Sequence, residues 1–182
     1  MCPTFSSVIR YDIGAAGPHV PGLLLVADRG QGVCAVFMGD EEAALMDELS
    51  ERFPHALLIQ DPAEMEAPLA AVQDLLADPD GGLDWPIDMP GTPFQIEVWQ
   101  ALQEVPPGVT VSYAQLAHRI GRPRAVRAVA SACAANPLAV VVPCHRVVHS
   151  DGGMAGYRWG LARKQRLLAR EAQLHHVHDL AA

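Results

Sequence analysis

The sequence lacks the cysteine patterns that bind structural zinc or carry out disulfide exchange. Its four cysteines, Cys2, Cys34, Cys133 and Cys144, are widely spaced and form no Cys-x-x-Cys pair. This spacing argues against a zinc ribbon and against a dithiol redox motif. Internal repeats and low-complexity segments are also absent. Half of the 182 residues are hydrophobic, so the chain has enough apolar material for one large domain or two small ones.

Membrane-spanning and secretory patterns are missing as well. The apolar stretch 125–145 is interrupted by Arg127, Asn136 and Pro137, which argues against a membrane span there. Residues 1–12 lack a basic segment followed by a long apolar one, so the sequence predicts no secretory signal. We therefore expect a cytoplasmic protein with no membrane partner, in which thiols stay reduced.

Positive charge is scarce in the first part of the chain and negative charge in the second. Residues 1–110 contain three arginines and 18 acidic residues, whereas residues 111–182 contain ten lysines and arginines and three acidic residues. Either the charged faces are segregated by chance or the second part meets a polyanion. We favour nucleic acid as the partner, because its binding needs clustered basic residues.

The first part is predicted to be a small α+β unit. Strands are expected at 8–13, 22–27, 32–38 and 57–59, the second and third forming an antiparallel hairpin, and helices at 41–53 and 64–77. Asp40 is expected to cap the first helix. Cys34 is interpreted as a core residue, and we find no catalytic constellation in this part.

A proline- and glycine-rich segment, 78–93, separates the two parts. Such composition is typical of a domain boundary, and the chain changes from acidic to basic soon afterwards. We therefore predict an N-terminal domain over 1–88 and a C-terminal domain over 89–182.

The second part is predicted to be mostly helical. Thr92 is expected to cap a first helix, with Pro93 at its first position and with Phe94, Val98 and Leu102 inward. Two further helices, 114–120 and 124–135, are joined by a turn containing Gly121, which indicates a helix-turn-helix. A glycine-rich loop, 150–157, precedes a last helix at 161–173.

The helix at 124–135 is rich in alanine and begins among arginines. Major-groove readout needs several long polar side chains on one face. Small side chains instead allow close approach to the sugar–phosphate walls, while one long arginine can enter the base stack, which favours sequence-tolerant minor-groove binding. The alternative is a core helix packed on two sides. The arginines at its start, Arg122, Arg124 and Arg127, favour DNA.

The last helix and the tail carry three further expectations. Leu161, Leu167 and Leu168 are predicted to face inward, and Arg163, Lys164, Arg166 and Arg170 outward. The tail histidines, His175, His176 and His178, are interpreted as solvated rather than as metal ligands. No metal site is therefore predicted anywhere in the chain.

A reactive centre is indicated at Cys144, which follows the apolar run 138–142 and Pro143. A thiol becomes a good nucleophile when a base or a positive charge lowers its pKa, and His145 and Arg146 supply both. Neighbouring side chains of an extended strand point to opposite faces, so a water could bridge Cys144 and His145. A buried structural cysteine is the alternative. Glu171 is the best candidate to orient the histidine, and Asn136 to fix the turn.

The stretch Pro143-Cys144-His145-Arg146-Val147 resembles the active-site signature of the O6-alkylguanine-DNA alkyltransferases, also called methylated-DNA–protein-cysteine methyltransferases. The resemblance covers nearly all of residues 92–171. It includes these further stretches: 94–102, 110–113, 127–129, Asn136-Pro137, 156–160 and 164–171. Residues 125–136 and 156–160 are similar to the C-terminal half of the bacterial adaptive-response members of this family. Residues 1–88 resemble, more loosely, the α/β subdomain that precedes that half in those proteins.

The resemblance implies an α+β fold with a ribonuclease H-like N-terminal subdomain and a winged helix-turn-helix domain that carries the active site. It implies that Cys144 accepts an alkyl group from O6-alkylguanine, with O4-alkylthymine as a further candidate. His145 would take the thiol proton through a water, Glu171 would orient His145, and Asn136 would brace the turn. The product is a thioether, so each chain would react once. The resemblance also implies that the protein acts as a monomer on double-stranded DNA and needs no cofactor.

The base must leave the duplex to reach such a site. Tyr113 would act at the flipped nucleotide, Arg127 would fill the gap, and the loop from Gly156 to Trp159 would wall the pocket. The full set of expected DNA- and base-binding residues is Tyr113, Arg124, Arg127, Arg146, Gly156, Tyr157, Arg158 and Trp159.

The sequence departs from the family pattern in two respects, and two other functions remain possible. The chain contains no counterpart of the N-terminal zinc-bearing part of the adaptive-response members, which puts gene regulation in doubt. Trp159 is bulky where some relatives have glycine, which predicts a tight pocket that favours methyl over benzyl adducts. A cysteine hydrolase could use the same Cys144, His145 and Glu171, but it would turn over. A non-enzymatic lesion binder would lack Cys144.

Overall fold

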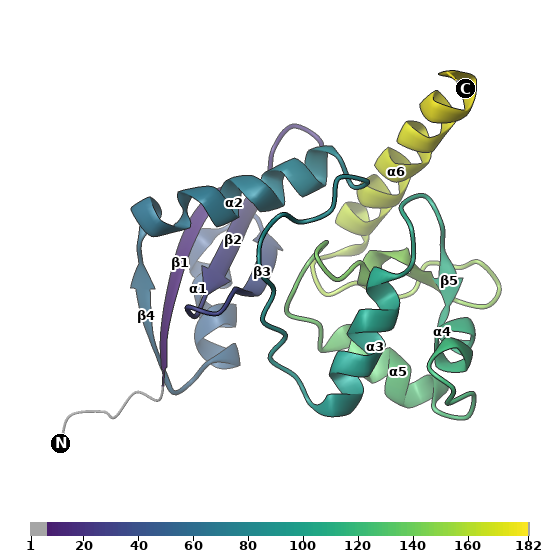
Figure 1. Ribbon diagram of the computed structural model, residues 1–182, viewed down its shortest axis with the longest axis horizontal. Coiled ribbons are helices and arrows are strands. Elements are labelled where there is room, and N and C mark those ends of the chain that lie inside the picture. Colours follow the sequence, from purple (N-terminus) through teal and green to yellow (C-terminus); the bar gives the residue numbers. More distant parts are fainter. Residues whose placement is uncertain (1–6, 182) are drawn as a thin grey trace. The chain divides into compact units, whose positions relative to one another are not determined.

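The structure, a computed structural model, describes the backbone of residues 7–181 and the side chains of residues 7–174. The chain divides into two compact units, Met1–Met89 and Pro90–Ala182 (Figure 1). Cys2 and the side chains of His175, His176 and His178 lie outside the described part, so the expectation about tail histidines stays a prediction. No helix within the described part is long and apolar enough to cross a membrane.

The first unit is built on a four-stranded sheet in the order β3-β2-β1-β4. Its strands are β1 (Ser7–Ala15), β2 (Leu23–Asp28), β3 (Val33–Gly39) and β4 (Ala56–Gln60). β2 pairs antiparallel with both β1 and β3, with Val26 opposite Val36 in the hairpin, while β4 runs parallel to β1. The four predicted strands and the antiparallel hairpin are confirmed.

Two helices cover opposite faces of this sheet (Figure 1). α1 (Glu42–Arg52) packs on β3, and α2 (Pro62–Ala77) packs on β1 and β2. The prediction that Asp40 caps α1 is wrong, because the N-cap is Glu41, whose side chain makes no capping bond. α2 begins two residues earlier than predicted because Asp61 caps it by accepting from the Glu64 amide.

The second unit contains four α-helices, a short 3₁₀ helix and a two-stranded parallel ladder. Its elements are α3 (Pro93–Gln103), β5 (Val111–Ser112), α4 (Tyr113–Arg119), α5 (Val126–Ala134), η1 (Cys144–Arg146), β6 (Val147–Val148) and α6 (Leu161–Ala181). The predicted Thr92 cap with Pro93 at the first position is confirmed. Trp99 of α3 is fully buried and donates to the Ala132 carbonyl of α5 at 2.9 Å, so a buried indole anchors these helices together.

The two predicted helices flanking Gly121 are confirmed as α4 and α5, which pack against each other. Gly121 has a φ of 68°, a left-handed conformation that ends a helix readily when the residue is glycine. Ser112 and Gln115 form a reciprocal capping box at the start of α4. α5 begins at Val126. Arg124, which was predicted to lie in this helix, therefore lies in the preceding turn.

The first turns of α6 differ from the predicted amphipathic pattern. Lys164, expected to face outward, is fully buried, whereas Leu161, expected to face inward, is 47% exposed. Leu167 is buried as predicted. The helix therefore turns a cation, in addition to Leu167, toward the interior of the second unit.

Candidate active site

The apolar run before the reactive centre forms a buried turn rather than an extended strand. Residues 138–142 are all buried, and the Val142 amide closes the turn by donating to the Leu138 carbonyl at 2.9 Å. Val140 has a φ of 59°, a conformation that is costly for a β-branched residue and persists only when its surroundings enforce it. The chain then enters η1, so neighbouring side chains there do not alternate as they would in a strand.

Asn136 holds this turn and contacts the reactive sulfur. Its Oδ1 accepts from the Leu138 amide at 2.9 Å, and its Nδ2 donates to the Val142 carbonyl at 2.9 Å and to the Cys144 Sγ at 3.2 Å. Asn136 is 1% exposed. A single buried amide therefore fixes both ends of the turn and donates to the sulfur, which agrees with the bracing expected of Asn136.

His145 and Glu171 form the pair that the sequence predicted. The Nε2 of His145 lies 2.7 Å from Oε1 of Glu171, and both side chains are almost fully buried. Burial lowers the pKa of His145 below its ordinary value, although Glu171 acts in the opposite direction. A neutral imidazole facing a carboxylate must carry its proton on Nε2. The lone pair then lies on Nδ1, which is buried and has no hydrogen-bond partner among the described residues, so Nδ1 can accept a proton.

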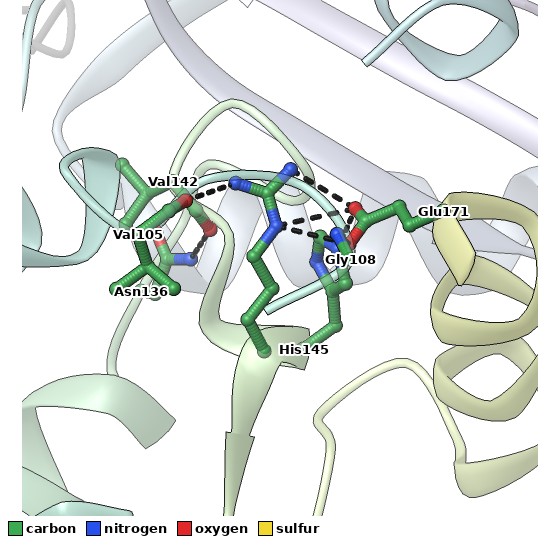
Figure 2. A network of polar contacts seen from close by, with 7 residues as sticks. Val105, Gly108, Asn136, Val142, His145 and Glu171 are labelled. Atoms are coloured by element: carbon green, nitrogen blue, oxygen red, sulfur yellow. Dashed lines mark hydrogen bonds and ion pairs between the residues drawn. The ribbon is translucent and has the colours of Figure 1, made fainter. Parts of the chain in front are cut away.

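Arg146 is a structural partner of Glu171, whose carboxylate Figure 2 shows together with His145 and Gly108. Its guanidinium is 7% exposed, lies 2.9 Å from Glu171 Oε1 and donates to the Val105 carbonyl. The expectation that Arg146 binds DNA or a base is therefore wrong, because its donors are spent inside the protein. Both neighbours of the carboxylate, His145 and Arg146, come from η1.

Glu171 is held as a carboxylate by these contacts. Burial alone would raise its pKa, but the hydrogen bonds and charges of His145 and Arg146 lower that pKa to about 2. The Gly108 amide also donates to its Oε2 at 3.1 Å. The carboxylate is thus a permanent acceptor, which fixes the orientation of the imidazole and favours its protonated form when a proton arrives.

Cys144 rests as a thiol. Burial raises its pKa to about 11, while the hydrogen bond from Asn136 and the positive charge of Lys164 act in the opposite direction. The residue is 8% exposed. An attack by this sulfur therefore requires a base, and the arrangement provides one in the neutral His145.

A pocket of about 380 Å³ lies at the sulfur and has mostly small residues in its wall. It is lined by Tyr113, Cys133, Ala134, Cys144, Gly156, Tyr157 and Arg158. Cys133 lines this pocket together with Cys144. The lining residues with polar side-chain groups other than thiols are Tyr113, Tyr157 and Arg158.

Trp159 stands apart from the other pocket residues predicted from sequence. It is 4% exposed, and its ring packs edge-on against Tyr157 at 5.2 Å between centroids. Trp159 contacts Tyr157, which lines the pocket, but is not itself among the lining residues. Its direct contact with a base, and the tight pocket expected from it, stay predictions.

The remaining predicted residues are two exposed arginines and two residues that line the pocket, Tyr113 and Arg158. Arg124 and Arg127 are exposed, and Tyr113 is half-buried with its ring 6.1 Å from that of His149. Arg158 donates to the Ala134 carbonyl at 3.4 Å. Sequence reasoning missed the burial of Lys164, because a lysine on an amphipathic helix gives no signal of burial.

Comparison with known proteins agrees with this geometry. Residues 93–173 match the family model described as the DNA-binding domain of 6-O-methylguanine DNA methyltransferase. The inducible methylated-DNA–protein-cysteine methyltransferase of Bacillus subtilis (strain 168) is 40% identical over 140 residues, which are 75% of this chain and 78% of that protein. The bifunctional transcriptional activator/DNA repair enzyme Ada of Escherichia coli (strain K12) is 51% identical over 152 residues, 84% of this chain but 43% of that protein.

Solved structures show the same relationship. The O6-methylguanine methyltransferase of Mycobacterium tuberculosis superposes with a TM-score of 0.72 at 31% identity, covering 91% of this chain and 93% of that one. A structure of that organism's protein in complex with DNA gives 0.67 at 30% identity, with the same coverage. The chain spans less than half the length of its Ada relatives. The 40% identity to the Bacillus subtilis protein over three quarters of each chain, together with the shared fold, shows that the chain belongs to the methylated-DNA–protein-cysteine methyltransferase family.

Proposed function

We propose that this chain repairs alkylated DNA by direct reversal, moving the alkyl group of O6-alkylguanine irreversibly to Cys144. One observation carries the proposal: a buried thiol opens into a pocket, and the neutral imidazole that follows it in sequence is backed by a carboxylate. Methyl groups on guanine are the first candidate lesion, and O4-alkylthymine is a second.

The transfer follows from the charges of the site. The proton of Cys144 passes to Nδ1 of His145, directly or through one water, and Glu171 stabilises the resulting imidazolium. The thiolate attacks the alkyl carbon, a sulfur–carbon bond forms, and the bond between carbon and guanine O6 breaks. Guanine leaves and takes up a proton. The thioether has no hydrolytic route back to a thiol, so each chain acts once.

The substrate base has to leave the duplex, because the sulfur lies at a buried pocket. We assign α4 and α5 to the DNA surface, with sequence-tolerant binding in the minor groove. Arg127 fills the gap left by the base, Arg124 contacts the backbone, and Tyr113 acts on the flipped nucleotide. Tyr157 and Arg158, with Gly156, receive the base. The exposure of both arginines beside an alanine-rich helix supports this assignment.

The finer descriptions of the fold and setting belong to the same proposal. We assign residues 1–88 to a ribonuclease H-like domain and residues 89–182 to a winged helix-turn-helix domain in which β5 and β6 contribute to the wing. The free thiols Cys34, Cys133 and Cys144 suit a reducing compartment, so we place the protein in the cytoplasm. We propose that it acts as a monomer.

The test is to weigh the protein after mixing it with duplex DNA carrying O6-methylguanine. A gain of one methyl group on the peptide containing Cys144, absent in Cys144→Ala and retained in Cys133→Ala, is expected. More than one equivalent of demethylated guanine per chain would favour a cysteine hydrolase, and so would demethylation without labelling of the protein. An unchanged mass with unchanged DNA would overturn the proposal.

A further inference from the structure

A second cavity, of about 320 Å³, lies within the first unit and has no part in the function proposed above. Its wall is formed by β1, the turn between β2 and β3, the start of α2 and the segment that follows α2. The lining residues that matter here are Arg10, Asp28, Gly32, Glu64, Trp85 and Pro86. Small-molecule sites usually occupy about 300 to 1,000 Å³ and combine apolar surface with a few polar groups, so this cavity has the size and the composition of a ligand site.

The wall that carries Trp85 is fixed by backbone contacts. The Val33 amide donates to the Pro86 carbonyl at 2.9 Å, and the Asp88 amide donates to the Val33 carbonyl at 3.0 Å. A Cβ on Gly32 would lie 2.5 Å from the Pro86 carbonyl oxygen, so the close approach of the two segments requires glycine. Hydrogen bonds therefore hold this wall against the start of β3, and the cavity is formed before any ligand binds.

Asp28 and Trp85 give the cavity a carboxylate and an aromatic ring that are bonded to each other. The indole Nε1 of Trp85 donates to Asp28 Oδ2 at 3.3 Å, and the Gly30 amide donates to Asp28 Oδ1 at 2.5 Å. Each oxygen of a carboxylate can accept more than one hydrogen bond, so Asp28 is held in place and can still accept from a ligand. The face of an indole attracts cations, and Trp85 is half-buried in the cavity wall.

The charge of the cavity is negative. Its charged lining residues are Asp28, Glu64 and Arg10, and Asp61 neutralises Arg10, since its Oδ2 lies 3.3 Å from the arginine Nε. Glu64 forms no ion pair with any side chain of residues 7–174. Residues 1–110 contain 18 acidic residues and three arginines, so the field of the surrounding chain also attracts cations. A cation in the cavity would meet two carboxylates, whereas an anion would be repelled.

We propose that this cavity binds a guanidinium group, which stacks on the indole of Trp85 and donates to the carboxylates of Asp28 and Glu64. A guanidinium is planar, is weakly hydrated and has paired donors that match a carboxylate, and tryptophan is the strongest cation partner among the aromatic side chains. A free small molecule or an arginine of another protein can supply the group. This binding goes beyond the proposed function, because it needs neither Cys144 nor DNA.

The test uses the full chain and three probes. Agmatine represents a free guanidinium, N-acetylarginine amide represents an arginine within a peptide, and N-acetylcitrulline amide has nearly the shape of the second probe without its charge. Calorimetry gives the affinity of each probe. Nuclear magnetic resonance of the indole N–H groups gives the location, because the chain has three tryptophans, Trp85, Trp99 and Trp159, and Trp85→Leu identifies the signal of Trp85.

We expect a saturable shift of the Trp85 signal with a guanidinium probe and none with the citrulline probe. Glu64→Gln should weaken binding by about tenfold or more, because it removes a charged acceptor. Glu66→Gln removes an exposed carboxylate of the same helix that does not line the cavity, and it should bind as the wild type does. Trp85→Leu should weaken binding by about 2- to 30-fold through loss of the aromatic face. Thermal unfolding shows which variants fold, and Trp85→Leu decides if Glu64→Gln does not.

Four results would each overturn the proposal. These are the absence of saturable binding by either guanidinium probe, equal binding of the citrulline probe, equal affinities in Glu64→Gln and Glu66→Gln, and a shift of the Trp159 signal in place of Trp85. The last result would place the probe in the pocket at Cys144, whose wall residue Tyr157 contacts Trp159. When the proposal holds, tighter binding of agmatine indicates a free small molecule, and tighter binding of N-acetylarginine amide indicates an arginine of another protein.

Discussion

The Nδ2 of Asn136 donates a hydrogen bond to the sulfur of Cys144 across 3.2 Å. The same amide group also bonds the Val142 carbonyl and the Leu138 amide. One side chain therefore sets the geometry of the turn and the acidity of the thiol, and the two effects can be measured separately.

Asn136→Ala should lower the free energy of unfolding by at least about 2 kcal/mol, because it leaves buried backbone groups without partners. It should also raise the pKa of Cys144, since a donor to the thiolate is lost. Asn136→Asp should raise that pKa further by placing a carboxylate at the sulfur. Urea unfolding and the iodoacetamide labelling rate report the two effects. Equal labelling rates in wild type and Asn136→Asp would contradict the contact.

Stability should fall in acid because of Glu171 and His145. The pKa of Glu171 is about 2 in the folded chain against an ordinary 4.5, so its contribution is complete above about 4.5 and is lost as the pH falls toward 2. This gap corresponds to roughly 3 kcal/mol. The lowered pKa of His145 acts in the same direction below its ordinary 6.5, since the unfolded chain takes up that proton first.

Urea unfolding from neutral to acid pH measures this dependence, with Glu171→Gln as the comparison. The variant should be less stable than wild type at neutral pH, and the difference should shrink as the pH falls. A difference that stays constant down to the lowest accessible pH would contradict the ionised state assigned to Glu171.

Two arginines of the predicted DNA surface should behave in opposite ways. Arg127→Gln should leave the thermal unfolding temperature unchanged, weaken DNA binding and reduce the slope of log affinity against log salt by about one. Arg146→Gln should destabilise the fold by about 3 to 5 kcal/mol, because it breaks a buried ion pair with Glu171. Binding titrations at several salt concentrations, together with unfolding curves, distinguish the two. A stable Arg146→Gln protein with a reduced salt slope would reverse the assignment.

Gly156 lines the pocket, and Gly91, which does not, provides a control for the effect of an added methyl group. A Cβ at Gly156 meets no atom within 4 Å, whereas a Cβ at Gly91 would lie 2.6 Å from the ring of the fully buried Trp99. Gly156→Ala should therefore keep wild-type stability and slow transfer from bulky adducts such as benzyl more than from methyl. Gly91→Ala should cost about 1 to 3 kcal/mol from overpacking and leave the ratio of benzyl to methyl transfer unchanged. Rates on both lesions and unfolding curves provide the check.

The secondary structure could be predicted largely because its signals are local. Alternating and apolar runs marked the four strands of the sheet, and Thr92 with Pro93 marked the start of α3. Cys144, His145 and Glu171 could be grouped because a nucleophile needs a base and a base needs a partner. The structure brings His145 and Glu171 within 2.7 Å across 26 residues of sequence.

The failures of prediction share one cause, which is tertiary packing that overrides local preference. Lysine normally faces water on an amphipathic helix, yet two carbonyls from distant segments draw Lys164 inside. Arg146 follows a nucleophile in a basic domain, yet Glu171 and the Val105 carbonyl occupy its guanidinium. The turn at 138–142 could not be predicted, because nothing in its apolar sequence indicates that Val140 is held at positive φ.

The resting thiol of Cys144 bears on how long an unused copy of the protein remains intact. A single-use sulfur that existed as a thiolate would be lost to oxidants and stray electrophiles, which react with thiolates. Because burial raises its pKa to about 11, Cys144 rests as a thiol at neutral pH. Burial thus slows the reaction of the sulfur with oxidants and electrophiles, and it keeps unused protein active until DNA damage occurs.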